Sequence, residues 1–257
     1  TLRLVRFQGD QMVPLAGKSY QKGGIQFSFK QHKPGMYRVV LKESRGSREQ
    51  PKAFNFIFNE ENMVFETDFR APQDSLKVLR SEENRIYHDF LGYHQTYERK
   101  MGLLNRMVEQ YPKYDPFYSQ VTKQYLKLQK RYRKAIDSIV TKHANTFAAH
   151  VVKSYKPPFV KSDFTPQERV SYLKEHFLRS IDFQDTLLVQ TPRIGQKILR
   201  YLSLYRQQGL SRSEQEKGLI KAVDRILLQA YINDTMYDYV LNYLVKGFER
   251  FKMEKVL

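Results

Sequence analysis

The spacing of apolar residues changes within residues 79–90, LRSEENRIYHDF. Before this stretch, apolar residues tend to alternate with polar ones, which is typical of a sheet with one buried face. After it, apolar residues recur every three or four positions, which is typical of helices packed against a core. The change of period therefore predicts an α+β fold, with a small antiparallel β-domain over residues 1–78 and a larger all-helical domain over residues 79–257.

The β-domain is expected to be sandwich-like and built from short strands. Segment 24–30, GIQFSFK, places three apolar side chains on one face, and segment 37–41 alternates in the same way. Segments 53–58 and 63–69, joined by the polar turn NEEN, predict an antiparallel hairpin. A turn at Gly23-Gly24 and a loop over 43–52 separate these strands. The aromatic residues expected to fill the core are Phe54, Phe56, Phe58, Phe65 and Phe69.

A long antiparallel helical hairpin is expected over about residues 82–143. Ser81 is a good N-cap, and Glu82 and Glu83 lie in the first turn, where the helix dipole favours acidic residues. Apolar residues then recur at helical spacing as far as the proline-containing segment YPKYDP. In the second helix the apolar seam has heptad spacing, which favours packing of the two helices. That seam consists of Val121, Tyr125, Leu128, Tyr132, Ala135 and Ile139.

Further helices are predicted after the segment KPPFVKSDF, which interrupts the helical pattern. The tetrapeptide TPQE is a strong start signal, with Thr165 as the cap, Pro166 at the first helical position and Glu168 closing a capping box. Three more helices are expected within 191–205, 213–230 and 234–251.

Composition excludes several classes of chemistry. The sequence contains no cysteine, so it has no disulfide framework, thiol nucleophile, Cys-x-x-Cys pair or thiolate zinc site of its own. No stretch approaches the run of about 18 apolar residues that a membrane span needs. With 41% hydrophobic content, the 257 residues are able to bury proper cores without such staples.

The histidines do not have the spacing of a metal site. His88 and His94 are six residues apart and lie on different faces of one helix, while His143 and His150 are two helical turns apart. We therefore interpret these histidines as surface or interhelical packing residues and predict neither a metal nor a cofactor. The adjacent carboxylates Glu60-Glu61 and Glu82-Glu83 are interpreted as solvated or capping groups, so no catalytic residue is assigned.

Several segments, in their order along the sequence, resemble a known family. FQGD, KPGMYRVVL, FNFIFNEENMVFETDF and LRSEENRIYHDF are similar to the N-terminal β-region and first helix of Gram-negative bacterial thioredoxin-like thiol-disulfide oxidoreductases. HFLRSIDFQDTLLVQTPRIGQKILRYLSLY and NDTMYDYVLNYLVKGFE resemble the helical domain of unknown function that precedes the thioredoxin fold in that family. The resemblance covers residues 7–257. The Cys-x-x-Cys thioredoxin domain of the family is absent from the chain.

The resemblance implies a non-enzymatic accessory module of an exported protein, located in the periplasm or cell envelope or anchored by a lipid. Its expected partners are a C-terminal thioredoxin-type domain of the same protein, an envelope protein, or both. In this interpretation the module positions or recognises a partner for the redox domain, which carries the thiol chemistry.

The charge distribution supports a second interpretation. The chain has a formal net charge of +17, and +9 of this lies between Tyr111 and Lys161, where eleven Lys or Arg residues face two acids. A stripe of Lys123, Lys127, Lys130 and Lys134, opposite the apolar seam, is the candidate anion- or partner-binding site. Its alternatives are a merely solvated face, a surface that binds an anionic envelope component such as a membrane, or a nucleic-acid surface. Against nucleic acid, the aromatic residues mostly occupy core positions.

Overall fold

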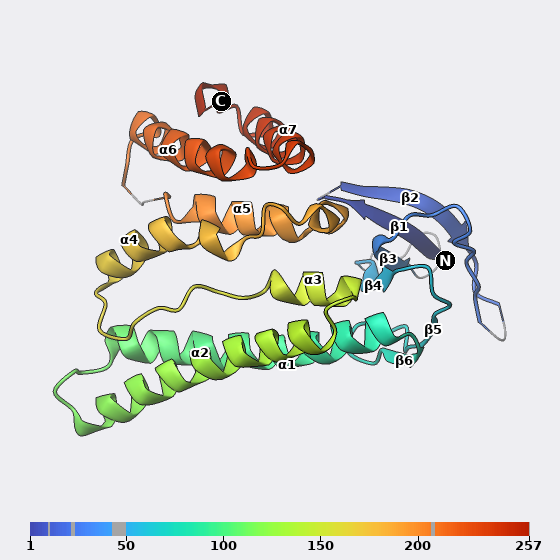
Figure 1. Cartoon of the computed structure of the whole chain (residues 1–257), viewed down its shortest axis with the longest axis horizontal. Coiled ribbons are helices and arrows are strands. Elements are labelled where there is room, and N and C mark those ends of the chain that lie inside the picture. Colours follow the sequence, from blue (N-terminus) through green and yellow to red (C-terminus); the bar gives the residue numbers. More distant parts are fainter. Residues whose placement is uncertain (10, 22–23, 43–49, 207–208, 257) are drawn as a thin grey trace.

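An antiparallel sheet forms the N-terminal part of the molecule. The structure, a computed structural model, describes residues 1–9, 11–21, 24–42, 50–206 and 209–256 (Figure 1). Within these ranges the sheet has the order β2-β1-β3-β4, and a separate ribbon pairs β5 with β6. The strands are β1 (Leu2–Gln8), β2 (Gln11–Lys18), β3 (Gly35–Leu41), β4 (Lys52–Phe58), β5 (Val64–Glu66) and β6 (Lys77–Arg80).

Both faces of the sheet are covered. Leu4, Tyr37 and Phe56 belong to a cluster on one face, together with aromatic residues from the segments that follow β2 and β4. The opposite face carries a second cluster, in which strand residues Phe7, Met36 and Ile57 pack against helical residues Tyr87, Phe147, Ala148 and Val151. The alternating side chains of β1, β3 and β4 thus join the sheet to the helices on one side and to irregular segments on the other.

Segment 24–30 alternates as predicted but is not a strand. Ile25, Phe27 and Phe29 are half-buried and their neighbours are exposed. The Phe29 ring lies 5.2 Å from the ring of Tyr37 and 4.6 Å from that of Phe58, measured between centroids. The segment therefore covers the face of the sheet without extending its ladder. Gly23 and residues 43–49 of the predicted loop lie outside the described residues.

The predicted hairpin between 53–58 and 63–69 is wrong. β4 pairs with β3, whereas β5 pairs with β6. Phe65 of β5 lies over the sheet, with its ring 5.7 Å from that of Phe54 and 5.5 Å from that of Phe56. At Ile57 the free edge of β4 is occupied by the Asn84 side chain, which accepts from the Ile57 N–H (2.8 Å) and donates to its C=O (2.7 Å).

Seven α-helices follow within the described ranges, consistent with the predicted α+β class. None of the described helices combines the length and apolar composition needed to cross a bilayer. The α-helices are α1 (Glu82–Gln110), α2 (Pro116–Lys142), α3 (Phe147–Lys153), α4 (Pro166–His176), α5 (Arg193–Ser203), α6 (Arg212–Ala230) and α7 (Asp234–Arg250). Short 3-10 helices are η1 (Leu178–Ser180), η2 (Thr186–Gln190) and η3 (Glu254–Val256).

The first turn of α1 connects three parts of the fold. Ser81 caps α1 as predicted, because its Oγ accepts from the Asn84 N–H at 3.0 Å. Glu83 is buried and accepts from the N–H groups of Phe147 (3.0 Å) and Ala148 (2.7 Å) at the start of α3. Through Glu83 and Asn84, α1 is therefore tied to α3 and to β4.

The helices α1 and α2 form an antiparallel hairpin with a shared core (Figure 1). Its most intimate ring contact joins Tyr97 of α1 to Tyr132 of α2, whose planes are 6° apart with centroids separated by 3.7 Å. Val121, Tyr125 and Tyr132 of the predicted seam are buried. Ala135 is only half-buried, and Gln129 and Ile136 take fully buried positions that the predicted seam omitted.

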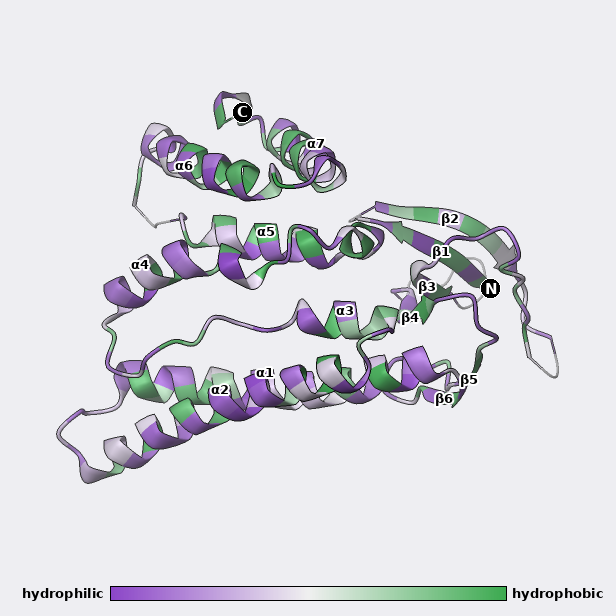
Figure 2. Ribbon diagram, in the orientation of Figure 1, coloured by the Kyte–Doolittle hydropathy of each residue, from purple (hydrophilic) through white to green (hydrophobic). Residues whose placement is uncertain are grey.

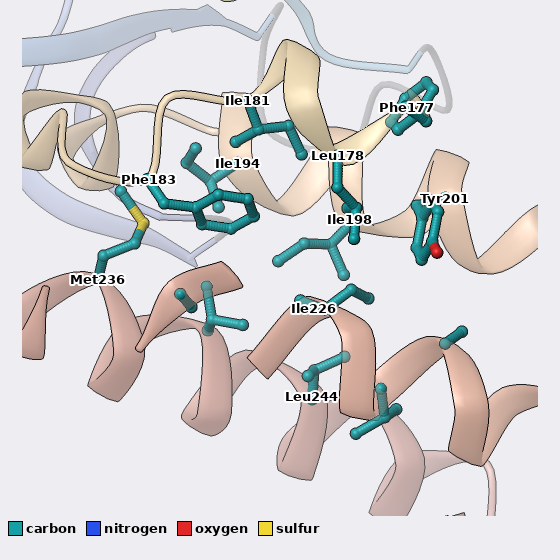
Figure 3. Packing of buried hydrophobic residues seen from close by; sticks show 14 of the residues in the cluster. Phe177, Leu178, Ile181, Phe183, Ile194, Ile198, Tyr201, Ile226, Met236 and Leu244 are labelled. Atoms are coloured by element: carbon teal, nitrogen blue, oxygen red, sulfur yellow. The ribbon is translucent and has the colours of Figure 1, made fainter. Parts of the chain in front are cut away.

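The last helices enclose the largest described apolar cluster. Figure 3 shows Ile194 and Ile198 of α5 facing Ile226 of α6 and Leu244 of α7, with Phe177 and Phe183 contributed by the segment before α5. In Figure 2, hydrophobic and hydrophilic residues alternate along α6 and α7, as expected for helices with one buried face. The predicted Thr165–Glu168 capping box of α4 is present, and Ser211 and Glu214 form another at α6.

The sheet also contacts the C-terminal helices. In the turn between β1 and β2, the N–H of Gly9 donates to the C=O of Val189 in η2 at 2.9 Å. Gly9 has a φ of +62°, and a Cβ placed on it would lie 2.1 Å from Cε2 of Tyr239 in α7. The division at residues 78 and 79 stays a prediction, because β6 (Lys77–Arg80) spans it and the sheet shares clusters with helices.

Candidate functional site

A hollow of about 590 Å³ opens among α3, the segment that follows it, α4, η1 and η2. Both polar and apolar side chains line it. One wall is the segment 154–159, which contains Pro157, Pro158 and Phe159, and the opposite wall includes Tyr172, His176 and Arg179. Its floor includes Ile181 and Leu188, which belong to the apolar cluster below.

Basic groups outnumber acidic ones in the lining. The four Lys or Arg residues are Arg133, Lys153, Lys156 and Arg179, and the two acids are Asp182 and Asp185. Asp182 accepts from the Lys153 ammonium at 2.8 Å, and Asp185 lies 2.8 Å from Nδ1 of His150. The Lys153 hydrogen bond holds the pKa of the Asp182 carboxyl below its usual value. Both acids are thus engaged inside the hollow, which leaves a cationic excess.

Two side chains of α2 fix the wall formed by residues 157–160. Gln129, buried in the hairpin core, donates to the C=O of Val160 and accepts from its N–H, both at 2.9 Å. The Arg133 guanidinium donates to the C=O of Pro157. The extended segment therefore has a fixed position although it contains no regular secondary structure. Sequence reasoning missed Gln129; its position within the heptad seam was the available signal.

A buried lysine lies behind the Ser180 wall. The Lys197 ammonium donates to the C=O of Ser180 at 2.8 Å and to its Oγ at 3.0 Å. Burial, aided by the charges of Arg193 and Arg200, lowers the pKa of Lys197 to about 7. Sequence reasoning also missed this residue, because its position in α5 is recognisable as buried only once the packing is known.

The serines of the hollow are held by main-chain groups. Ser180 Oγ donates to the C=O of Phe177 at 2.7 Å, and Ser154 Oγ donates to the C=O of Val151 at 2.6 Å. Ser154 also accepts from Nε of Arg193, whose guanidinium stacks 3.5 Å from the centre of the Tyr155 ring. Neither hydroxyl donates to a histidine, so the arrangement of a serine nucleophile with an imidazole base is not formed here.

The predicted lysine stripe lies on α2, opposite the buried seam. All four side chains, Lys123, Lys127, Lys130 and Lys134, are exposed. Arg133, which lies one residue before Lys134, turns toward the hollow, while Asp137 of the same helix pairs with Lys156 at 2.5 Å. The stripe and the hollow are therefore separate basic surfaces that share the C-terminal half of α2.

The histidines take packing positions. His94 Nδ1 lies 2.7 Å from the Tyr132 hydroxyl within the hairpin, and burial lowers the pKa of His94 and of His88 to about 4. His143 Nδ1 lies 3.5 Å from a carboxylate oxygen of Glu82. Among the described residues, no group of three or more His, Asp and Glu side chains is placed to hold a metal ion.

The comparisons with known proteins concern the helical part of the molecule. Residues 129–246 match the family described as "Domain of unknown function (DUF5106)". The helical part contains a DUF5106 domain. The match runs from within α2 to within α7, so the DUF5106 domain contains every lining residue of the hollow together with Lys130 and Lys134 of the stripe. No curated protein and no solved structure matches the chain.

The DUF5106 match agrees with one part of the sequence analysis. A domain of unknown function was expected in the helical region, and the match lies there. The match itself provides no link to thioredoxin-like proteins, and it leaves the sheet and α1 unassigned.

Proposed function

We propose that this chain is a non-catalytic binding module of an envelope thioredoxin-like thiol-disulfide oxidoreductase. In this proposal the DUF5106 domain recognises a partner protein and presents it to a thioredoxin-type domain. The observation that carries the proposal is the hollow, which is open, basic and partly apolar, and lies wholly within the DUF5106 domain. Concave sites that combine apolar walls with a few placed polar groups are typical of binding sites.

The sequence supports the redox connection of this proposal. The segments that resemble the oxidoreductase family occur in the family's order, from FQGD to NDTMYDYVLNYLVKGFE. Because the chain has no cysteine, thiol chemistry in such a protein must reside on another domain. An accessory role is therefore the role left for these residues in a thiol-disulfide oxidoreductase.

A second candidate function is favoured by the exposed lysine stripe. Four like charges on one helix face attract an anionic surface, whether a membrane headgroup layer, an acidic protein or nucleic acid. In this alternative the chain is a basic binding module for an anionic envelope component. The two functions are compatible, because the stripe and the hollow occupy different surfaces.

The proposed function is tested by steady-state kinetics. A thioredoxin-type domain of the resembled family is joined to the end of this chain, and reduction of a panel of disulfide-bonded envelope proteins is compared with that by the redox domain alone. A recognition module is expected to lower KM for a subset of substrates and leave kcat unchanged. Equal KM values for every substrate, or disulfide reduction by this chain alone, would contradict the proposal.

A further inference from the structure

The hollow presents a cationic group that has no partner within the protein. Arg179 lines the hollow and is exposed, and in the described part of the chain its guanidinium forms neither a hydrogen bond nor an ion pair. Nearby, Lys156 lines the same hollow and pairs with Asp137, which is not part of the lining. A planar guanidinium with free donors is suited to bidentate binding of a carboxylate or a phosphate.

Apolar groups lie beside these cations. Pro157, Pro158 and Phe159 form one wall, and the segment that carries them is fixed to α2 through Gln129 and Arg133. The prolines lack N–H donors, so this part of the wall offers carbonyl groups and apolar surface. The wall is thus preformed, which reduces the entropic cost of binding an apolar side chain.

The two carboxylates of the lining distinguish between kinds of anionic ligand. Asp182 and Asp185 repel a polyanion such as a nucleic acid, but each retains acceptor capacity for N–H donors. A polypeptide supplies both what Arg179 binds and what these carboxylates bind. Its acidic groups match the guanidinium, and its amide N–H groups match the carboxylates.

We infer that the hollow binds a polypeptide segment in which a carboxylate lies next to an apolar side chain. Arg179, assisted by Lys156, holds the carboxylate, and the wall at Phe159 receives the apolar side chain. The carboxylate belongs either to an Asp or Glu side chain or to the C-terminus of the bound polypeptide. This inference rests on the proposed function, since it names the kind of partner that the DUF5106 domain recognises.

The test uses the whole protein and a combinatorial pool of fluorescein-labelled octapeptides built from Glu, Phe, Ser and Lys. Each peptide is made with a free and with an amidated C-terminus, and binding is measured by fluorescence anisotropy at low ionic strength. Peptides that contain Glu beside Phe are expected to bind best. Retention of binding after amidation assigns the carboxylate to a side chain, and its loss assigns it to the C-terminus.

Two variants and a matched control complete the experiment. Arg179→Gln with Lys156→Gln is expected to weaken binding about tenfold or more, since it removes charge-assisted hydrogen bonds. Phe159→Ala should weaken only the Phe-containing peptides. Lys217→Gln with Lys221→Gln removes the same charge from exposed positions on α6 and should change little. Circular dichroism melts check that each variant is folded.

Three results would overturn the inference. The first is the absence of any peptide that binds better than the Ser-only peptide, and the second is equal weakening by the hollow variant and the control. The third is tighter binding of a single-stranded oligonucleotide of equal charge. Failure here leaves the kinetic test of the proposed function standing, because a partner recognised through the lysine stripe would still lower KM.

Discussion

At the scale of single residues, Lys197 is expected to make stability depend on pH. Its pKa is about 7 in the folded protein, against an ordinary value of 10.5. Between these values the unfolded state binds more protons, so the free energy of unfolding rises with pH by about 1.4 kcal/mol per unit from this group. Below pH 7 the cost of burying the charge is fully present.

Replacing Lys197 with methionine should remove this contribution. Urea denaturation from pH 7 to pH 9.5 is expected to show a slope for Lys197→Met that is lower than the wild-type slope by about 1 kcal/mol per pH unit. Lys221→Met, at an exposed position of α6, serves as the control and should keep the wild-type slope. Identical slopes for wild type and Lys197→Met would show that the buried amine keeps its ordinary pKa.

His88 is expected to make the fold sensitive to acid. Burial lowers its pKa to about 4, and its buried Nε2 has no hydrogen-bond partner in the described part of the chain. The unfolded state therefore binds more protons as the pH falls from 6.5 to 4, and stability is lost over that window. We expect His88→Leu to gain about 2–3 kcal/mol relative to wild type at pH 4.5. At pH 8 we expect little difference, as measured by denaturant titration; a constant difference at both pH values would argue against this assignment.

Residues whose partners are close in sequence were predictable, and those with distant partners were not. Ser81 and Thr165 accept hydrogen bonds from residues three positions later, so a local pattern was enough to identify both caps. Glu83 bonds to residues 64 and 65 positions away, and Gln129 to a residue 31 positions away. A first-turn glutamate and a glutamine in a helix look ordinary in sequence, so their buried roles became visible only with the tertiary structure.

At the scale of secondary-structure elements, Glu83 is expected to hold α3 against α1. Glu83→Ala leaves two buried N–H groups at the start of α3 without acceptors and should lower the free energy of unfolding by about 3 kcal/mol or more. Glu82→Ala is the matched control, because that side chain is 70% exposed, and it should cost less than about 1 kcal/mol. Amide hydrogen exchange at Phe147 and Ala148 should quicken only in Glu83→Ala, and similar behaviour of the two variants would refute this role.

Helices were more predictable than strand pairing for a physical reason. Helical hydrogen bonds are local, so the bounds of α1, α2 and α4 followed from caps and apolar spacing. Strand partners are chosen by tertiary contacts, and here Asn84 occupies the edge of β4 where the predicted hairpin partner would have paired. Alternation correctly marked Ile25, Phe27 and Phe29 as inward-facing but did not distinguish a strand from a segment lying over the sheet.

At the scale of the whole molecule, the turn at Gly9 is expected to couple the sheet to the C-terminal helices. Gly9→Ala places a methyl group against the Tyr239 ring at a positive φ, so we expect a loss of about 2 kcal/mol. In a double-mutant cycle, Tyr239→Ala should restore part of this loss by removing the clash. Thermal melts measure both effects, and additive losses would show that the two residues do not touch.

The position of the candidate site was only partly predictable from sequence. The lysine stripe could be placed because helical periodicity locates residues on α2 relative to its own seam. The hollow assembles Arg133, Lys153 and Arg179 from three separate elements, and nothing in their spacing indicated that they would meet. The basic composition alone predicted a binding surface without locating it.

The central claim is that this chain binds a partner for a thioredoxin-type domain, and direct binding to that domain tests it. Isothermal titration calorimetry of the protein against a thioredoxin-type domain of the resembled family is performed at low and at high ionic strength, with anionic vesicles as a separate titrant. The comparison variant changes Lys123, Lys127, Lys130 and Lys134 to Gln, and the control changes the exposed Lys217, Lys221, Lys246 and Lys255 to Gln.

The account predicts salt-sensitive binding to the redox domain that the stripe variant loses and the control retains, with both variants folded. Loss of vesicle binding alone would favour the second candidate function, a module for an anionic envelope component. The absence of binding to the redox domain at low ionic strength, or equal binding by wild type and the stripe variant, would contradict docking of that domain through the lysine stripe.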